Sequence, residues 1–205
     1  MQVTIFKNIH STATGFDRTP DFIFDRIRNG ASKDLIKEIR GKTTKTEKNA
    51  LKKNLPSICW SGRFKNRSDI GLLEHSGLIC LDFDGFKDEE SLRDWKLITE
   101  GVEFTYASFI SPSGEGLKVI VKIPQCNKDD HKLYFEALED FFQSPHFDVS
   151  SSNISRVCYE SYDPEIYVNE DSTIWEKMKE EDIMITAEVD PPLILKSTSK
   201  IIQNI

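Results

Sequence analysis

The stretch GLICLDFDG, residues 77–85, decides how the rest of the chain is interpreted. Its apolar part, residues 77–83, has the length and composition of a buried strand. Side chains alternate between the two faces of a strand, so Asp82 and Asp84 share one face. Two carboxylates about 7 Å apart along a strand repel each other, and a divalent cation such as Mg²⁺ or Mn²⁺ removes that repulsion. We therefore interpret the pair as metal ligands rather than as a solvated strand end.

Helix and strand patterns around this stretch follow the order β-α-β-β-α-β. Strands are predicted at 77–83, 104–110, 117–123 and 154–160, helices at 88–98 and 130–143, and a further strand at 164–168. This order is typical of an α+β, RRM-like unit with the antiparallel strand order 4-1-3-2. The first strand is then central, and residues 82–84, 117–118 and 148–156 meet at one edge of the sheet.

The first third of the chain is expected to form a separate, basic α/β unit. Residues 1–68 contain 15 Lys and Arg against 6 Asp and Glu, whereas residues 69–205 contain 12 against 28. The basic excess indicates a surface for a polyanion, although solvated helix faces would give the same count. Candidates for contact with nucleic-acid phosphates are Lys48, Lys52, Lys53, Arg63, Lys65 and Arg67. We divide the chain into this unit (1–70), the RRM-like catalytic unit (71–170), and an acidic helix at 172–184 with a tail or linker (171–205).

The composition excludes several classes of protein. With 38% hydrophobic and 30% charged residues and a net charge of −7, the 205-residue chain is not collagen-like, coiled-coil or disordered. No apolar run approaches the roughly 20 residues that span a bilayer, and the N-terminus lacks a signal-peptide pattern, so we expect a cytoplasmic protein without a membrane partner. The four cysteines are widely spaced, which favours reduced thiols over a disulfide framework or a zinc site.

Asp148, in the loop HFDVSSSNISR (146–156), is the expected third carboxylate. Taken alone it is an ordinary loop residue, and only the predicted topology brings it beside the first two. Three carboxylates at one edge can hold two metal ions for in-line displacement at phosphorus. Arg156 follows in an apolar strand, where it can bind a phosphate bidentately or form a structural ion pair with Glu160 or Asp163.

The turn SPSGEGLK, residues 111–118, is the expected nucleotide-binding site, with a plain hairpin turn as the alternative. Gly114 and Gly116 allow backbone N–H groups to approach an anion. Ser111 and Ser113 add hydroxyl donors, and Lys118 adds a positive charge.

Together these motifs resemble the archaeo-eukaryotic primase superfamily, in its primase-polymerase branch. The most similar members are the primase-like domains of bacterial mobile elements and phages that are labelled the VirE N-terminal domain. The resemblance covers about residues 30–170. Its motifs are K-x-x-L-P (52–56), S-G-x-F (61–64), H-S-G-L-I-x-L-D-F-D (75–84), S-P-S-G-x-G-L-K (111–118) and S-R-V-C-Y-x-S-x-D-P (155–164).

The resemblance implies a function and a set of roles. Asp82, Asp84 and Asp148 would bind catalytic Mg²⁺ or Mn²⁺, and an RRM-like unit would pack on an N-terminal α/β unit. The partners would be a single-stranded DNA template, NTPs or dNTPs and a helicase domain or protein, in the replication of a mobile element or phage. Lys118 stands where the wider superfamily has a nucleotide-binding histidine, a departure that agrees with the mobile-element subfamily.

Two other functions remain open from the sequence. The first is a non-catalytic nucleic-acid-binding replication module. It stays open because Lys118 replaces the histidine of the wider superfamily and cannot reproduce the geometry of its imidazole. The second is a phosphatase of the haloacid dehalogenase type, whose nucleophile motif resembles LDFDG. That class needs a parallel sheet and Thr or Val after the motif, whereas this chain has Phe86 and the order β-α-β-β-α-β.

Overall fold

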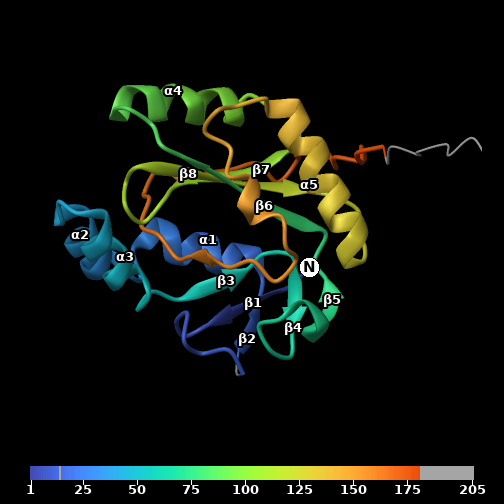
Figure 1. The fold of residues 1–205 in the computed structure, drawn as a ribbon, viewed down its shortest axis with the longest axis horizontal. Coiled ribbons are helices and arrows are strands. Elements are labelled where there is room, and N and C mark those ends of the chain that lie inside the picture. The colour runs from blue at the N-terminus through green and yellow to red at the C-terminus, as the bar shows by residue number, and fades with distance from the viewer. Residues whose placement is uncertain (14, 181–205) are drawn as a thin grey trace, which may run out of the picture.

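Two antiparallel four-stranded sheets form the frame of the protein (Figure 1). The structure is a computed structural model that describes residues 1–13 and 15–180. The first sheet has the order β2-β1-β3-β9, the second has the order β10-β7-β8-β6, and β4 and β5 form a separate hairpin. The strands are β1 Val3–Phe6, β2 Gly15–Arg18, β3 Ser57–Cys59, β4 Gly62–Phe64, β5 Leu72–His75, β6 Leu78–Asp84, β7 Thr105–Ile110, β8 Gly116–Lys122, β9 Cys158–Tyr159 and β10 Tyr167–Val168.

Five α-helices in the described residues join these strands. They are α1 Pro20–Asn29, α2 Lys33–Gly41, α3 Lys45–Lys52, α4 Glu89–Glu100 and α5 Lys128–Phe142. Gly30 ends α1 in the left-handed conformation (φ 77°), which favours glycine. Asn127 caps α5 by accepting from the backbone N–H groups of Asp129 and Asp130.

The three strands at the centre of the prediction pair as expected. β6 pairs with β8, and β8 pairs with β7, both antiparallel. This antiparallel arrangement excludes the parallel sheet that a haloacid dehalogenase-type phosphatase requires. The register places Asp82 opposite Lys118 and Asp84 opposite Gly116, so the acidic strand end lies against the predicted phosphate turn.

The fourth strand of the RRM-like prediction is wrong. β9 does not pair with β6 but with β3 of the other sheet, where Cys158 lies opposite Ile58. The outer edge of β6 carries only a single antiparallel bridge, between Phe83 and Phe147. A 3-10 turn at Val149–Ser151 then ends this edge pairing, and the chain continues to β3. The order 4-1-3-2 is therefore not formed, because β6 is the last strand of its sheet and β10 takes the opposite edge beside β7.

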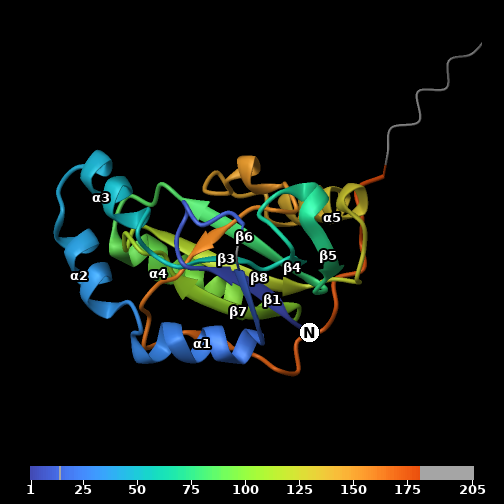
Figure 2. The same ribbon diagram turned by 90° about the horizontal axis from the view of Figure 1, so that it is seen from below.

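The sheet that contains β6 separates two apolar layers. Figure 1 shows α4 and α5 on one side of it and α1 on the other, and Leu81 and Phe83 face the α4 and α5 side. Leu78, Phe109 and Ile120 face the other way and pack with residues of α1, β1 and β3. Side chains from both predicted units thus share one core. The helices α2 and α3 lie together at one end of the molecule in both views (Figure 2).

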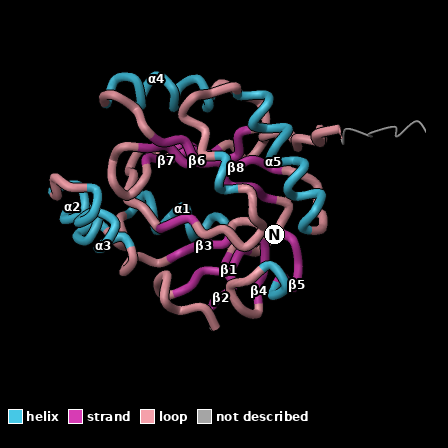
Figure 3. Tube along the Cα trace, viewed as in Figure 1, coloured by secondary structure: helices cyan, strands magenta, loops and turns pink. Residues whose placement is uncertain are grey.

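Some predicted features are corrected outside the sheets. No helix forms over residues 172–180, where the acidic helix is expected, and the rest of that prediction lies outside the described residues (Figure 3). Instead, Trp175 N–H donates to Lys122 O at 2.8 Å and holds this segment beside the sheet. The strands β2, β4 and β5 are short and were not expected from the sequence. All four cysteines are free thiols, as predicted, and no helix among the described residues is long and apolar enough to cross a membrane.

The shared core predicts that the two units unfold together. Phe109 is fully buried between them. We expect Phe109→Ala to lower the free energy of unfolding by about 3–5 kcal/mol while keeping a single transition in urea. Leu97→Ala, at a 66% exposed position on α4, is the control and should change stability by less than about 0.5 kcal/mol. Two separate transitions in the wild-type protein would contradict the shared core.

Candidate functional site

A cleft of about 610 Å³ opens where the end of β6 meets the start of β8. Its walls come from segments that are far apart in the sequence: α3, β6, the turn before β8, and the loop that leads into β9. Of the predicted site residues, the cleft is lined by Lys52, Arg67, Asp82, Asp84, Ser111, Lys118, Asp148 and Arg156.

The backbone brings the three predicted carboxylates together. Asp84 N–H donates to His146 O, and Asp148 N–H donates to Asp82 O, both at 2.8 Å. These two hydrogen bonds attach the loop to the outer edge of β6. Asp148 therefore lies beside Asp82 although 66 positions separate them in the sequence. The predicted meeting of the segments is confirmed, but through this edge pairing and not through a fourth strand.

Asp82 forms an ion pair with Lys118 across the β6–β8 ladder. Burial alone would lower the pKa of Lys118, but the Asp82 carboxylate and its acidic neighbours outweigh burial and raise this pKa above its ordinary value. Only one carboxylate oxygen, Oδ2, takes part in the pair. The other, Oδ1, is buried and has no hydrogen-bond partner among the described residues. An unpaired buried carboxylate oxygen is costly, and a bound cation would satisfy it.

Asp84 lies at the mouth of the cleft, and the absence of a side chain at Gly116 makes room for its carboxylate. A Cβ atom at Gly116 would overlap Asp84 Oδ1. Partial burial raises the pKa of Asp84, and the charges of Asp82 and Asp148 raise it further, while Lys118 and Lys52 oppose the shift. The three carboxylates therefore repel one another, which is the condition that a divalent cation relieves.

Asp148 is held in place by its own loop. Its carboxylate accepts from Ser150 N–H at 3.0 Å, from the Ser150 hydroxyl at 2.7 Å and from the Ser151 hydroxyl at 3.0 Å. Burial raises the pKa of Asp148, but these hydrogen bonds and the charge of Arg156 more than compensate, and the pKa falls below its usual value. Asp148 is therefore ionised near neutral pH and available as a ligand.

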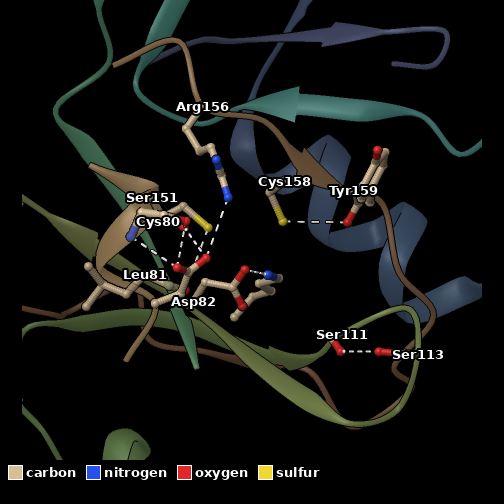
Figure 4. A network of polar contacts seen from close by, with 12 residues as sticks. Cys80, Leu81, Asp82, Ser111, Ser113, Ser151, Arg156, Cys158 and Tyr159 are labelled. Atoms are coloured by element: carbon tan, nitrogen blue, oxygen red, sulfur yellow. Dashed lines mark hydrogen bonds and ion pairs between the residues drawn. The ribbon is translucent and has the colours of Figure 1, made fainter. Parts of the chain in front are cut away.

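Arg156 approaches this group from the segment before β9 and lies 3.5 Å from Asp148, Nη2 to Oδ2 (Figure 4). The two structural ion pairs considered for it are not formed. Glu160 instead pairs with Arg26 at 2.6 Å. Asp163 accepts from the backbone N–H of Ile110 at 2.8 Å. Arg156 is about half-exposed, and its guanidinium can reach a ligand in the cleft.

The predicted phosphate turn divides between this cleft and a neighbouring one. Ser111 and Ser113 are buried, and their hydroxyl groups contact each other at 3.3 Å (Figure 4). Gly114 has a φ of 77°, the left-handed region that favours glycine. Arg40, which the sequence analysis missed, holds the turn by donating to Ser111 O at 3.3 Å and to Tyr162 O at 2.9 Å.

The neighbouring cleft, of about 850 Å³, lies on the other side of Asp84. Asn49, Lys52 and Asp84 line both clefts, so α3 forms the boundary between them. Lys48 of this helix pairs with Glu115 of the turn. Burial lowers the pKa of Lys52, although the nearby Asp84 carboxylate opposes this.

Not all predicted nucleic-acid contacts face the clefts. Lys48 and Lys52 line the larger cleft, and Arg67 lines the smaller one. Arg63 lies elsewhere, in ion pairs with Asp17 at 2.8 Å and with Glu74 at 3.1 Å. Lys53 and Lys65 line neither cleft. Arg63, Lys53 and Lys65 belong to the same basic part of the sequence as the other candidates. A basic composition does not predict which face of the molecule a side chain occupies.

The donor types of this cleft suit Mg²⁺ or Mn²⁺, although the three aspartates are not among the side chains whose ligand atoms all lie within 4.8 Å of one another in the described residues. Both ions prefer carboxylate oxygens, and the site offers three carboxylates, one of which has a buried oxygen without a hydrogen bond. The nearby cations, Lys118 and Arg156, balance this charge in the structure described here. The geometry therefore provides a mixed acidic and basic cleft that suits a metal-bound phosphate ester.

The described residues form an α+β protein with antiparallel sheets. Comparison with known protein families identifies the family to which the chain belongs. Residues 50–168 match the family described as BT4734-like, N-terminal domain, and the chain belongs to this family. The matched segment contains all three carboxylates, the turn 111–118 and Arg156, and its description differs from the VirE label expected from the motifs. No curated protein matches the chain.

One solved structure is similar to this chain. It is the AEP domain (PP-N190) of the cyanophage S-2L primase-polymerase, PrimPol. The two structures superpose with a TM-score of 0.44 at 11% sequence identity, over 85% of this chain and 83% of that one. At this low similarity, the likeness does not indicate the activity of this chain.

The space at Gly116 gives a direct test of the carboxylate group. Gly116→Ala should displace the Asp84 carboxylate together with the backbone of β6, because its Cβ would overlap Asp84 Oδ1 and lie 2.7 Å from Phe83 O. We expect it to weaken Mn²⁺ binding about 10-fold or more, measured by isothermal titration calorimetry. Gly41→Ala is the matched control, because a Cβ there meets no atom within 4 Å, and it should leave Mn²⁺ binding unchanged. Equal Mn²⁺ affinity in the two variants would show that Asp84 is not a ligand.

Proposed function

We propose that this protein is a template-directed nucleotidyltransferase of the primase-polymerase type. In the reaction, the 3′-hydroxyl oxygen of a nucleic-acid strand attacks the α-phosphorus of a nucleoside triphosphate. A new oxygen–phosphorus bond forms, the bond from the α-phosphorus to the oxygen that bridges to the β-phosphate breaks, and pyrophosphate leaves. The hydroxyl group gives up its proton to solvent.

One observation carries the proposal: Asp82, Asp84 and Asp148 share a cleft whose lining also includes four basic side chains, those of Lys52, Arg67, Lys118 and Arg156. Carboxylates alone would suit a simple cation site, and basic residues alone would suit a passive phosphate site. Their combination supports a reaction on a metal-bound triphosphate. Family membership adds no function of its own to this argument.

The three carboxylates would hold Mg²⁺ or Mn²⁺. When bound, these ions lower the pKa of the attacking hydroxyl group and stabilise the negative charge on pyrophosphate. The protein fixes the positions of the ligands through the β6 strand and the hydrogen bonds of its outer edge. The unpaired Oδ1 of Asp82 is available without breaking an existing hydrogen bond.

Lys118 and Arg156 would bind the triphosphate. Both lie against carboxylates now, and an incoming metal–nucleotide complex brings phosphate oxygens that can replace those partners. The turn at 111–116 borders the same space through Ser111. The template, a single DNA strand, would contact Lys52 and Arg67 at the rim, with Lys48 in the neighbouring cleft.

A non-catalytic nucleic-acid-binding module is the second candidate. The observation that favours it is the charge balance of the cleft, since Lys118 and Arg156 already neutralise two of the carboxylates. Such a protein would bind nucleic acid through the same basic rim without incorporating nucleotides.

Primer extension with Mn²⁺ separates the two candidates. The wild-type protein should extend a primed single-stranded DNA template. Asp82→Asn, Asp84→Asn and Asp148→Asn should each reduce extension by about 100-fold or more while DNA binding is kept, because each removes a charge from the metal site. Asp94→Asn, a change on the α4 surface, is the control. Template binding by the wild-type protein without any incorporation would favour the non-catalytic module.

The role of Lys118 can be tested separately from the metal site. Lys118→Met should weaken nucleotide binding by about 10-fold to 100-fold, the effect of losing one charge-assisted phosphate contact. DNA affinity should change much less, because Lys118 lies inside the cleft. Lys53→Met, at an exposed position outside both clefts, is the control for charge alone. An equal loss of nucleotide and DNA affinity in Lys118→Met would reject the assigned role.

A further inference from the structure

A second group of metal-ligating side chains lies at the opposite end of β6. It consists of His75 at the end of β5, Cys126 between β8 and α5, and His131 in the first turn of α5. Both histidines are buried, and Cys126 is half-buried. None of the three lines either cleft, and the proposed nucleotidyl transfer does not use them.

Two of the three distances between the donor atoms match the edges of a metal coordination tetrahedron. His75 Nε2 lies 3.1 Å from His131 Nδ1 and 3.7 Å from Cys126 Sγ. The ligand atoms of all three residues lie within 4.8 Å of one another. Tetrahedral zinc has Zn–N bonds of about 2.0–2.1 Å and Zn–S bonds of about 2.3 Å, so the N–N and N–S edges are about 3.3 Å and about 3.6 Å.

We propose that His75, Cys126 and His131 form a binding site for a thiophilic divalent metal ion, Zn²⁺ in the first place. Two imidazoles and a thiolate are a ligand set typical of zinc, whereas the carboxylate cleft suits hard cations. Three protein ligands leave the fourth position to a water molecule. The ion would join three segments: the end of β5, the connection between β8 and α5, and α5 itself.

The protein already presents these side chains in a restrained geometry. Gln125 Nε2 donates to His75 O at 2.7 Å, and Gly77 N–H donates to His75 Nδ1 at 3.0 Å. The second bond places the proton of neutral His75 on Nε2, from which it is donated to His131 Nδ1. Without metal, the pair is therefore a hydrogen bond between two neutral imidazoles.

Metal binding requires a defined movement of protons. The Cys126 thiol releases its proton to solvent, and the sulfur binds as thiolate. The Nε2 proton of His75 is replaced by the metal, and the ring carries its proton on Nδ1 instead, so the bond from Gly77 N–H is given up. One proton is released overall. The loss of a single backbone hydrogen bond is small beside coordination of a metal ion by three protein ligands.

The protonation states of the histidines suit this role. Burial lowers the pKa of His75 to about 4, and burial with the neighbouring His75 lowers the pKa of His131 to about 3. Both imidazoles are therefore neutral above pH about 5 and need no deprotonation to become ligands. Burial raises the pKa of Cys126 to about 11, so the thiol proton is the one that is released to solvent when the metal binds.

The experiment measures metal binding directly and does not depend on enzymatic activity. The full chain is stripped with a chelator and titrated with Zn²⁺ in excess Mg²⁺, which competes for the carboxylate cleft. We expect one equivalent of tightly held Zn²⁺, a rise of several degrees in Tm, and, with Co²⁺ in its place, the absorption of a tetrahedral thiolate complex. In the ¹⁵N NMR spectrum, His75 should change from the Nε2-protonated to the Nδ1-protonated tautomer.

Matched variants assign the ion to this cluster. Cys126→Ser and His131→Gln should each lower the Zn²⁺ affinity by about 100-fold or more and abolish the Tm shift. His10→Gln, a change at an exposed histidine, and Asp84→Asn, in the carboxylate cleft, should retain both. No stoichiometric binding in the wild-type protein, or unchanged affinity in Cys126→Ser, would overturn the proposal and leave the two histidines as a hydrogen-bonded pair. Either result leaves the nucleotidyltransferase proposal untouched, because primer extension tests that separately.

Discussion

Two backbone hydrogen bonds on the outer edge of β6 determine the geometry of the candidate active site. They join Asp84 N–H to His146 O and Asp148 N–H to Asp82 O, each at 2.8 Å. Neighbouring strands in such a pairing lie about 4.8 Å apart, so the bonds fix Asp148 beside the strand end whatever its side chain does. The third carboxylate is thereby positioned by the backbone, which resists substitution of nearby side chains better than a side-chain network would.

The charges of the cleft follow from this arrangement. Three carboxylates would repel one another if they stood alone; burial is the main cause of the raised pKa of Asp84, and this repulsion adds to it. Lys118 and Arg156 reduce it by pairing with Asp82 and Asp148. In the proposed reaction, the same two cations would donate hydrogen bonds to phosphate oxygens once a divalent ion has taken over the carboxylates. One set of side chains can thus stabilise the free protein and bind the substrate.

The sequence predicts the local elements well and their pairing less well. The strands predicted at 77–83 and 117–123 and the helix predicted at 130–143 each depend on neighbouring residues. They form at Leu78–Asp84, Gly116–Lys122 and Lys128–Phe142, within two residues of the predicted bounds. Of the strand predicted at 154–160, only Cys158–Tyr159 forms, and its pattern contains no information about which sheet it joins. An edge contact such as Phe83 with Phe147 has no strand-length pattern at all.

The same distinction applies to the site. The acidic pair was visible because alternation places both residues on one face. Asp148 was selected from the predicted topology: the predicted strand pairing is wrong, but the loop still brings Asp148 beside Asp82. Arg40 and Asn49 could not be found, since they are ordinary helix residues until the fold brings α2 and α3 to the clefts. The group of His75, Cys126 and His131 was also missed, because its members come from three separate segments without a local metal-binding motif.

The most direct test of the central claim is a crystal structure of the protein soaked with Mn²⁺ and a non-hydrolysable nucleoside triphosphate. The anomalous signal of manganese marks the ion independently of any assumption about the ligands. We expect it between the carboxylates of Asp82, Asp84 and Asp148, with the triphosphate against Lys118. Manganese bound elsewhere on the molecule, with this cleft empty of both metal and nucleotide, would contradict the account.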